Sequence, residues 1–221
     1  MSENTAAAGI AETVRFSIVI QKILQLSTQN TGAAPYPEFF VETYMTYMTY
    51  MNYGYWENGT RDCVEACENL LRKLIAPMTD TTGRILDVGC GLGFTTRFLC
   101  TFWNPEHVYG IDISEALIAR CRENAPKCNF GTMDATALGF DNEFFDNVIS
   151  VEAVFHFHPR RAFYGEALRV LKPGGVLALT DFANHKDSVP EYRARLLDAG
   201  FAGTHVDDFT AHGADAYFRF I

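Results

Sequence analysis

The sequence lacks a C-x-x-C pair, and its six cysteines do not combine with histidine at zinc-ligand spacing. We therefore expect no metal site and interpret the cysteines as reduced, small apolar residues. Positive charge is also scarce, since 18 Lys and Arg stand against 27 Asp and Glu, a formal net charge of −9. This balance argues against a nucleic-acid partner, which needs a basic surface. It leaves room for a nucleotide-like cofactor held by backbone amides.

Long apolar segments are missing as well. No run approaches the roughly 20 residues that a membrane span needs, and the first ten residues lack a charged-then-apolar leader. We therefore expect a cytoplasmic protein with no membrane partner. The 221 residues are 48% hydrophobic and 20% charged, which fits one globular domain with a small appendage.

The N-terminal part is expected to be helical. Residues 10–26 and 37–50 carry apolar side chains in helix-like patterns, and Gly54 follows the second segment. A third helix is expected from Thr60, as N-cap, to Pro77. We predict that these helices form a cap over residues 1–80, ahead of a cofactor-binding catalytic domain over residues 81–221.

From residue 84 the pattern changes to strands that alternate with helices. Strands are expected at 84–89, 107–113, 128–133, 144–153 and 174–182, and helices at 94–102, 114–124, 159–171 and 189–200. Two more strands, at 204–209 and 214–221, would follow one another like a hairpin. Such alternation is typical of a sheet covered by helices on both faces. We predict a doubly wound α/β fold with a seven-stranded, mostly parallel sheet and an N-terminal helical cap.

A glycine-rich loop, "LDVGCGLGF", ends the first of these strands. Gly89, Gly91 and Gly93 allow a tight turn and bring a ligand against backbone N–H groups at a helix N-terminus. The spacing is G-x-G-x-G, and Phe94 stands where a dinucleotide fingerprint needs its last glycine. Asp87, inside the strand, would repel a pyrophosphate but suits a cationic ammonium.

Two further aspartates follow the next two strands. Asp112 stands about 19 residues after Gly93, where a carboxylate can accept both hydroxyls of a ribose. Asp134 follows the third strand, where it can accept from the amine of an adenine held between Ile113 and Met133. Because these acids end consecutive strands in register with a glycine loop, we expect one nucleoside site at that edge of the sheet.

These motifs resemble those of the class I S-adenosylmethionine-dependent methyltransferases. The resemblance is carried by "ILDVGCGLGFTTRFL", "VYGIDIS", "LKPGG" and "VPEYRARLLDAGF", and covers about residues 83–221. It implies the family's Rossmann-like fold, two antiparallel closing strands, and S-adenosyl-L-methionine as cofactor. It also implies these cofactor contacts: Asp87, Gly89, Cys90, Gly91 and Gly93 at the methionine end and ribose, Asp112 at the ribose hydroxyls, and Met133, Asp134 and Ala135 at the adenine.

The stretch after the fourth strand indicates the class of acceptor. It lacks the Asn/Asp-Pro-Pro-aromatic motif that enzymes acting on DNA or protein amides often carry, and it resembles the small-molecule, natural-product branch, where Glu and His recur at the positions of Glu152 and His156. We predict His156 as the base or acceptor-positioning group and Glu152 near the sulfonium. Phe155 replaces a carboxylate of the alkaloid enzymes, which argues against an alkaloid amine. His158 is expected to begin a helix.

The aromatic and methionine-rich segment before residue 57 completes the predicted site. "MNYGYW" resembles a turn that folds over the cofactor in the same branch, which implies Tyr55 and Trp56, with Tyr44, near its methionine half. Tyr47, Met48 and Met51, together with His156, are expected to line the acceptor pocket. Only about eight residues separate the fifth strand from the next helix, so the pocket is expected to be open or completed by a second subunit in a homodimer.

We therefore predict methyl transfer to a small, aromatic or apolar metabolite of secondary metabolism, with O-methylation slightly ahead of N- or C-methylation. One alternative is an NAD-dependent oxidoreductase, which Phe94 disfavours. Another is a non-catalytic, methyltransferase-like binding subunit. The intact loop, the acids and the Glu152/His156 pair argue against it without excluding it.

Overall fold

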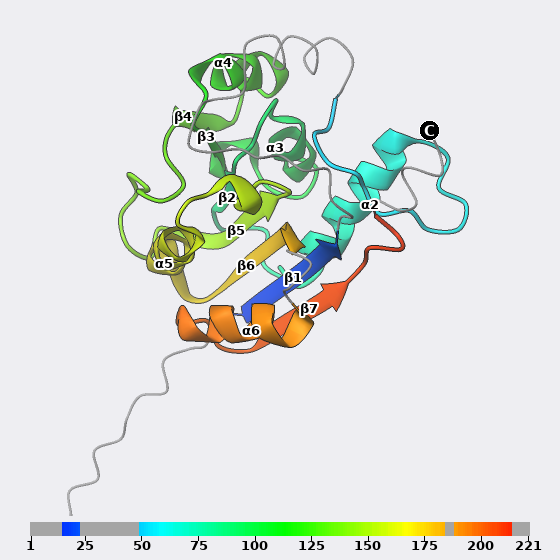
Figure 1. The fold of residues 1–221 in the computed structure, drawn as a ribbon. Coiled ribbons are helices and arrows are strands. Elements are labelled where there is room, and N and C mark those ends of the chain that lie inside the picture. The colour runs from blue at the N-terminus through cyan, green and yellow to red at the C-terminus, as the bar shows by residue number, and fades with distance from the viewer. Residues whose placement is uncertain (1–14, 23–48, 184–187, 214–221) are drawn as a thin grey trace, which may run out of the picture.

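The structure is a computed structural model that describes residues 15–22, 49–183 and 188–213. One sheet forms the centre of the described chain, with strand order β4-β3-β2-β5-β6-β1-β7 (Figure 1). All strand pairings recorded in these residues are parallel. The strands are β1 (Arg15–Lys22), β2 (Ile85–Val88), β3 (Val108–Asp112), β4 (Asn129–Thr132), β5 (Phe145–Val151), β6 (Leu171–Ala183) and β7 (Thr204–Asp208).

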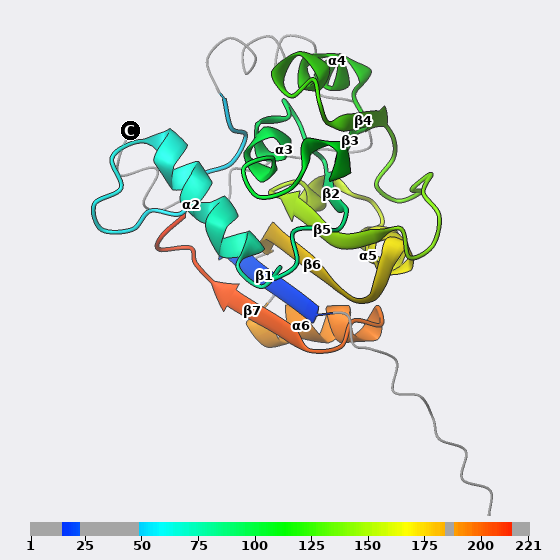
Figure 2. The ribbon, with the colours of Figure 1, turned by 180° about the vertical axis from the view of Figure 1, so that it is seen from behind.

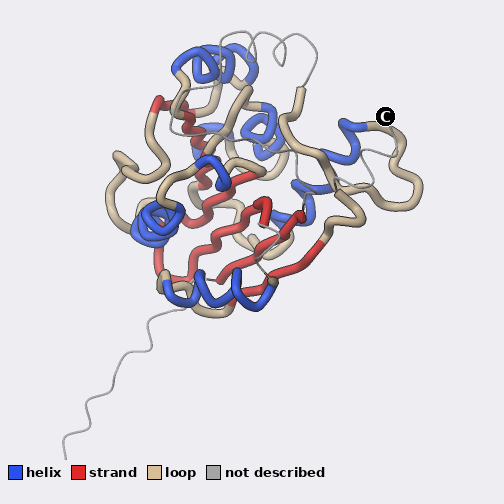
Figure 3. Tube along the Cα trace, in the orientation of Figure 1, coloured by secondary structure: helices blue, strands red, loops and turns tan. Residues whose placement is uncertain are grey.

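Helices cover both faces of the sheet. The view from behind shows α2 crossing in front of the strands, whereas α6 crosses them in the opposite view (Figures 1 and 2). Figure 3 shows the strands lying side by side between these helices. The helices are α2 (Cys63–Ile75), α3 (Phe94–Leu99), α4 (Glu115–Asn124), α5 (Arg160–Val170) and α6 (Val189–Asp198), with short 3₁₀ turns η1 (Pro105–His107) and η2 (Val154–His156).

The two apolar layers arise from the two-residue period of the strands. Along β6, Leu177 and Leu179 belong to the cluster that α5 and α6 cover. Val176 and Ala178, on the opposite face, belong to the cluster that α2 and α3 cover. Both faces are therefore buried, which explains why the strands are nearly continuous apolar runs. The predicted α/β architecture with a parallel sheet is confirmed.

The helix predicted over residues 10–26 is wrong, because the described part of this segment is strand β1. It lies between β6 and β7, with Ile18 in register with Leu179 of β6 and Val206 of β7. Its sequence, RFSIVIQK, carries three consecutive β-branched residues, which suit a strand inside a sheet. An apolar run of this length fits both periodicities, and only its non-local partners decide between them. One of the three segments predicted for the N-terminal helical cap therefore belongs to the sheet.

The start of α2 also differs from the sequence prediction. Asp62, and not Thr60, caps α2, because its carboxylate accepts from the Glu65 N–H at 2.9 Å. The Thr60 hydroxyl instead accepts from the Glu57 N–H in the preceding turn. The helix predicted over 37–50 and the strand predicted over 214–221 lie outside the described residues, except that residues 49–50 are not helical. β7 pairs with β1 in parallel.

Candidate active site

The glycine loop lies between β2 and α3 and is tied to the end of β3. The N–H groups of Gly89 and Cys90 both donate to the Ile111 carbonyl, at 2.8 and 2.9 Å. Gly93 is the N-cap of α3 with φ +78°, a left-handed conformation that side chains disfavour. A Cβ on Gly93 would also lie 3.0 Å from the Cys121 Sγ of α4. Glycine is therefore required here both for the turn and for the close approach of α4.

Asp87 is buried beneath this loop. It is 1% exposed, and the Thr96 hydroxyl donates to its Oδ2 at 2.7 Å. Burial raises the pKa of Asp87 to about 7, against the lowering effect of the Thr96 hydrogen bond, and the nearby Asp112 adds to the rise. A cation next to this carboxyl would stabilise its ionised form.

Asp112 lies at the carboxyl end of β3 and contacts the same loop. Its Oδ2 accepts from the Gly91 N–H at 3.1 Å, and its Oδ1 accepts from the Ser114 N–H at 3.0 Å. Burial raises the pKa of Asp112, while these N–H donors oppose the rise. The predicted meeting of the glycine loop with Asp112 is thus present in the structure. The Asp112 carbonyl also accepts from the Met133 N–H at 3.0 Å, which joins the ends of β3 and β4.

The residues predicted around an adenine lie at this junction. Ile113 is 66% exposed and follows the half-buried Asp112. Met133 is half-buried, Ala135 is buried and Asp134 is exposed. The Asp134 Oδ1 accepts from both the N–H and the hydroxyl of Thr136 at 2.7 Å, which fixes the carboxylate in a local turn.

Glu152 follows β5 in a strained and buried position. Its φ is +50°, which is uncommon for a residue with a side chain, and it is 8% exposed. The Glu152 N–H is held by Thr180 of β6, whose hydroxyl accepts it at 2.8 Å. Burial raises the pKa of Glu152 to about 8, although the Tyr53 N–H, 3.3 Å from both carboxylate oxygens, opposes the rise. Strain of this kind is typical of functional sites.

The segment before α2 lies against the loop through Met51, which the sequence interpretation selected, and through Tyr50 and Tyr53, which it did not. The Tyr50 ring lies 5.9 Å from the Phe94 ring at the start of α3. The Met51 Sδ would be 2.9 Å from a Cβ on Gly91, so Met51 packs directly against the glycine loop. Tyr53 reaches Glu152 through its backbone N–H. Because any residue other than proline can donate its backbone N–H, the sequence does not reveal a contact of this kind.

Tyr55 and Trp56 both contact His212, in the C-terminal part of the described chain. The Tyr55 ring stacks on the His212 ring at 5.1 Å, with the Lys73 Nζ 5.2 Å from its centroid. The Trp56 N–H donates to the His212 carbonyl at 2.6 Å, and its indole N–H donates to the Tyr53 carbonyl at 2.8 Å. These contacts anchor the turn to the C-terminal part of the chain, so cofactor contact by Tyr55 and Trp56 stays a prediction. Tyr44, Tyr47 and Met48 lie outside the described residues.

His156 ends the 3₁₀ turn η2, one turn after Glu152. Its side chain is exposed, and its ring centroid lies 3.9 Å from that of Phe155. Partial desolvation lowers the pKa of His156, and the neighbouring His158 lowers it further. The imidazole is therefore neutral at pH 7 and able to accept a proton.

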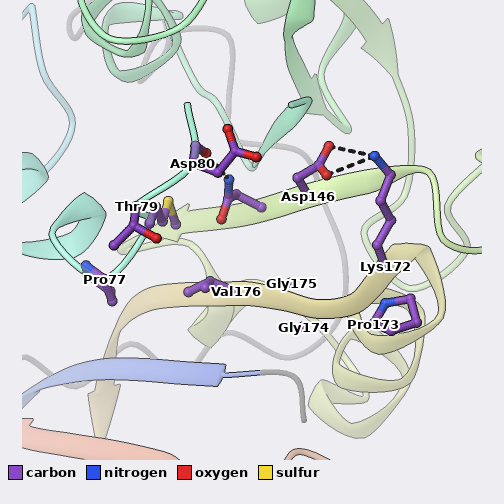
Figure 4. A pocket seen from close by; sticks show the side chains of 11 residues that line it. Pro77, Thr79, Asp80, Asp146, Lys172, Pro173, Gly174, Gly175 and Val176 are labelled. Atoms are coloured by element: carbon purple, nitrogen blue, oxygen red, sulfur yellow. Dashed lines mark hydrogen bonds and ion pairs between the residues drawn. The ribbon is translucent and has the colours of Figure 1, made fainter. Parts of the chain in front are cut away.

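A hollow of about 650 Å³ lies at the opposite, amino-terminal edge of β5 and β6 (Figure 4). The Lys172 Nζ is 2.8 Å from both oxygens of Asp146, and Asp146 also accepts from the Arg84 N–H at 2.8 Å. Gly83 leaves the space that Asp146 occupies, since a Cβ there would collide with its carboxyl. We assign these contacts to the joining of strand ends, because ligands of parallel sheets bind at the carboxyl edge.

The described site fits a cationic nucleoside ligand. Three neighbouring strands carry these acids: Asp87 lies within β2, Asp112 ends β3 and Glu152 follows β5. Burial raises the pKa of each. Such a cluster of acids favours positive charge nearby, which would keep all three ionised. Within the described residues, no group of three or more His, Cys, Asp or Glu side chains could hold a metal ion.

Comparison with known proteins assigns this segment to a family. A family model described as a methyltransferase domain matches residues 86–179. This range contains the glycine loop and the residues Asp87, Asp112, Asp134, Glu152 and His156. The chain carries a class I S-adenosylmethionine-dependent methyltransferase domain. The family implies S-adenosyl-L-methionine as the cofactor of this methyltransferase domain.

Curated relatives of the methyltransferase domain act on small molecules, according to their names. The chain is 37% identical over 135 residues to erythromycin 3''-O-methyltransferase of Saccharopolyspora erythraea, covering 58% of this chain and 44% of that protein. It is 35% identical to 27-O-demethylrifamycin SV methyltransferase of Amycolatopsis mediterranei, covering 59% and 50%. It is 41% identical to 2-methyl-6-phytyl-1,4-hydroquinone methyltransferase of Synechocystis, covering 47% and 33%. The chain thus spans half or less of the length of these three relatives.

Solved structures share the fold. The [4+2]-cyclase SpnF matches with a TM-score of 0.63 and 23% identity, over 73% of this chain and 68% of that one. A protein of Pyrococcus horikoshii matches with a TM-score of 0.51 and 28% identity, over 72% and 69%. At its level of identity, the likeness to SpnF concerns the fold alone. In the described part of the chain, no helix is both long and apolar enough to cross a bilayer.

Proposed function

We propose that the chain is a cytoplasmic enzyme that transfers a methyl group from S-adenosylmethionine to a small, aromatic or apolar metabolite, with O-methylation slightly favoured. The observation that carries the proposal is the set of three acids beside the glycine loop, the buried Asp87 and Glu152 and the half-buried Asp112, in a segment that matches a methyltransferase domain. The names of the relatives support a small-molecule acceptor, and two of the three name oxygen as the acceptor atom.

The residues that would hold the cofactor divide between its charged and neutral parts. S-adenosylmethionine supplies, when bound, a methyl group on a sulfonium that is already electrophilic. Asp87 and Glu152 would face its positive charges, since burial leaves both carboxyls with a strong preference for a nearby cation. Asp112 would accept the ribose hydroxyls, and Ile113 and Met133, with Asp134 and Ala135, would contact the adenine. Gly89, Cys90, Gly91 and Gly93 would allow close approach.

The acceptor would lie between η2 and the segment before α2. Met51 packs on Gly91, and His156 ends the turn that follows Glu152. For a hydroxyl acceptor, the imidazole of His156, whose pKa is lowered, would take the proton at a ring nitrogen. Tyr47, Met48 and Tyr44 are proposed to complete the pocket from residues 1–80, above a catalytic domain over 81–221. A second copy of the chain in a homodimer would be able to close its open side.

The proposal is tested first by calorimetric titration with S-adenosylmethionine and, separately, with NAD. We expect the first ligand to bind and the second to give no heat of binding. Binding of NAD alone would reject the proposal in favour of an oxidoreductase. Turnover of a panel of small hydroxylated aromatic and apolar metabolites, followed by the mass of the methylated product, then identifies the acceptor. Cofactor binding without turnover across all acceptors would favour a non-catalytic subunit.

The role of His156 is tested by comparing two neighbouring histidines. His156→Ala should lower kcat by about 100-fold if the imidazole is the base, with nearly unchanged cofactor affinity. His158→Ala is the matched control, because this exposed ring lies two residues away next to Pro159. A loss of less than about threefold in His156→Ala would reduce that ring to a packing role.

A further inference from the structure

Two pairs of cysteine side chains lie close together on one side of the sheet. The Cys100 and Cys128 Sγ atoms are 3.1 Å apart, and the Cys90 and Cys121 Sγ atoms are 3.7 Å apart. The first pair joins the end of α3 to the residue before β4, and both of its thiols are half-buried. The second pair is fully buried beneath the glycine loop. Only the first pair is therefore open to a solute oxidant.

The two sulfurs of the accessible pair are not equivalent. The hydrogen bond with Cys128 lowers the pKa of the Cys100 thiol, and the same bond raises the pKa of Cys128. Cys100 is therefore the better thiolate, and thiolates are the species that peroxides oxidise. Cys128 stays protonated next to it, in the position of a resolving thiol.

We propose that Cys100 and Cys128 form a thiol oxidation site that closes to a disulfide when the protein meets a peroxide. The Cys100 thiolate attacks the peroxide, so an S–O bond forms, the O–O bond breaks and hydroxide leaves. Cys128 then attacks the Cys100 sulfur, so the S–S bond forms as the S–O bond breaks, and the hydroxyl leaves with the Cys128 proton as water. The released hydroxide takes up the proton that Cys100 lost on ionisation, so two electrons pass from the sulfurs to hydrogen peroxide and two waters result. A disulfide of about 2.05 Å requires the sulfurs to approach by about 1 Å.

The site is connected to Asp87 by two hydrogen bonds. The Cys100 thiol donates to the Thr96 carbonyl at 3.4 Å, and the Thr96 hydroxyl donates to the Asp87 carboxylate at 2.7 Å. A disulfide removes the thiol proton and pulls on the end of α3, a helix of only six residues that begins at the glycine loop. Oxidation should therefore weaken the hold of Asp87 on the cofactor, a consequence that rests on the proposed function.

Peptide mapping tests the cross-link without any variant. The reduced full chain has six thiols, and hydrogen peroxide should leave four that react with maleimide. Trypsin separates the four cysteines, with Cys90 in 85–97, Cys100 in 98–120, Cys121 in 121–122 and Cys128 in 128–160. We expect 98–120 joined to 128–160, and dithiothreitol should separate them. Six intact thiols, oxygen added to Cys100 without a cross-link, or 85–97 joined to 121–122 would overturn the proposal.

Variants and a binding measurement test the rest. Cys100→Ser and Cys128→Ser should each abolish the cross-link, whereas Cys63→Ser, a half-buried thiol at the start of α2, should keep it. Oxidised wild type should bind S-adenosylmethionine at least about threefold more weakly than reduced wild type, and peroxide should not change the affinity of Cys100→Ser. Equal affinity in fully cross-linked protein would overturn the connection to Asp87. If reduced protein binds no S-adenosylmethionine, the proposed function fails while the peptide map still decides the oxidation site.

Discussion

The pH dependence of stability provides a test of the Glu152 site that needs no ligand. Burial raises the pKa of Glu152 from 4.5 to about 8 in the folded protein. The folded state therefore keeps a proton that the unfolded state has lost over this range of pH. The resulting stabilisation is fully present below pH 4.5 and is lost as the pH rises to about 8. Glu152→Gln removes this titration and keeps an amide oxygen that can accept the Tyr53 N–H.

The expected size follows from the shift in pKa. Each unit corresponds to about 1.36 kcal/mol, so the whole range corresponds to up to about 5 kcal/mol and the interval from pH 5 to pH 8 to about 4 kcal/mol. The free energy of unfolding of Glu152→Gln, minus that of wild type, should therefore rise by up to about 4 kcal/mol across this interval. This is a large part of the 5–15 kcal/mol that typically stabilises a domain.

Urea denaturation at pH 5, 6, 7 and 8 measures this difference, with tryptophan fluorescence as the signal. Trp56 and Trp103 are 8% and 2% exposed, so unfolding changes the surroundings of both. Asp141→Asn, which changes an exposed carboxylate, is the matched control and should show no comparable dependence on pH. A difference between Glu152→Gln and wild type that stays constant within about 0.5 kcal/mol would refute the argument that Glu152 is held protonated by burial.

Other predictions concern the loop and its acids. Asp112→Ala should weaken S-adenosylmethionine binding by at least about tenfold in calorimetry, because hydrogen bonds to a charged group contribute about 1.5–3 kcal/mol. Thr96→Val should weaken binding while Thr96→Ser preserves it, because only the hydroxyl supports the Asp87 carboxylate; equal affinities would contradict this role. Gly93→Ala should lower the Tm by roughly 4–8 °C, from about 2 kcal/mol of strain and crowding. Gly165→Ala, in the open middle of α5, should instead raise it, since glycine destabilises a helix by about 0.5–1 kcal/mol relative to alanine.

The parts of the site that could be predicted are those that one strand and its following loop determine. Gly89, Gly91 and Gly93 have a spacing that restricts their ligand, and Asp112 ends the next strand of a parallel sheet. The carboxyl ends of neighbouring parallel strands meet at one edge, so a correct division into strands is enough to bring these residues together. The hydrogen bond from the Gly91 N–H to Asp112 is the structural form of that rule.

The parts that could not be predicted depend on non-local pairing. Residues 15–22 fit a helix or a strand by pattern, and only the partners on β6 and β7 decide for the strand. Tyr53 contacts Glu152 through its backbone, which the identity of the side chain does not reveal. Thr96 could have been found, since a threonine in the first turn of the helix after the loop can reach back to an acid in the preceding strand.

Glu152 shows why the segment before α2 belongs to the site. Its backbone is held in a left-handed conformation by Thr180, so the side chain is fixed at the end of β5 before any ligand is considered. Its carboxylate accepts from the Tyr53 N–H, which comes from a part of the chain 99 residues away. Because Met51 also packs on Gly91, movement of residues 51–53 would change the glycine loop and the Glu152 carboxylate together. Cofactor access and the protonation of Glu152 are therefore expected to be coupled through this segment.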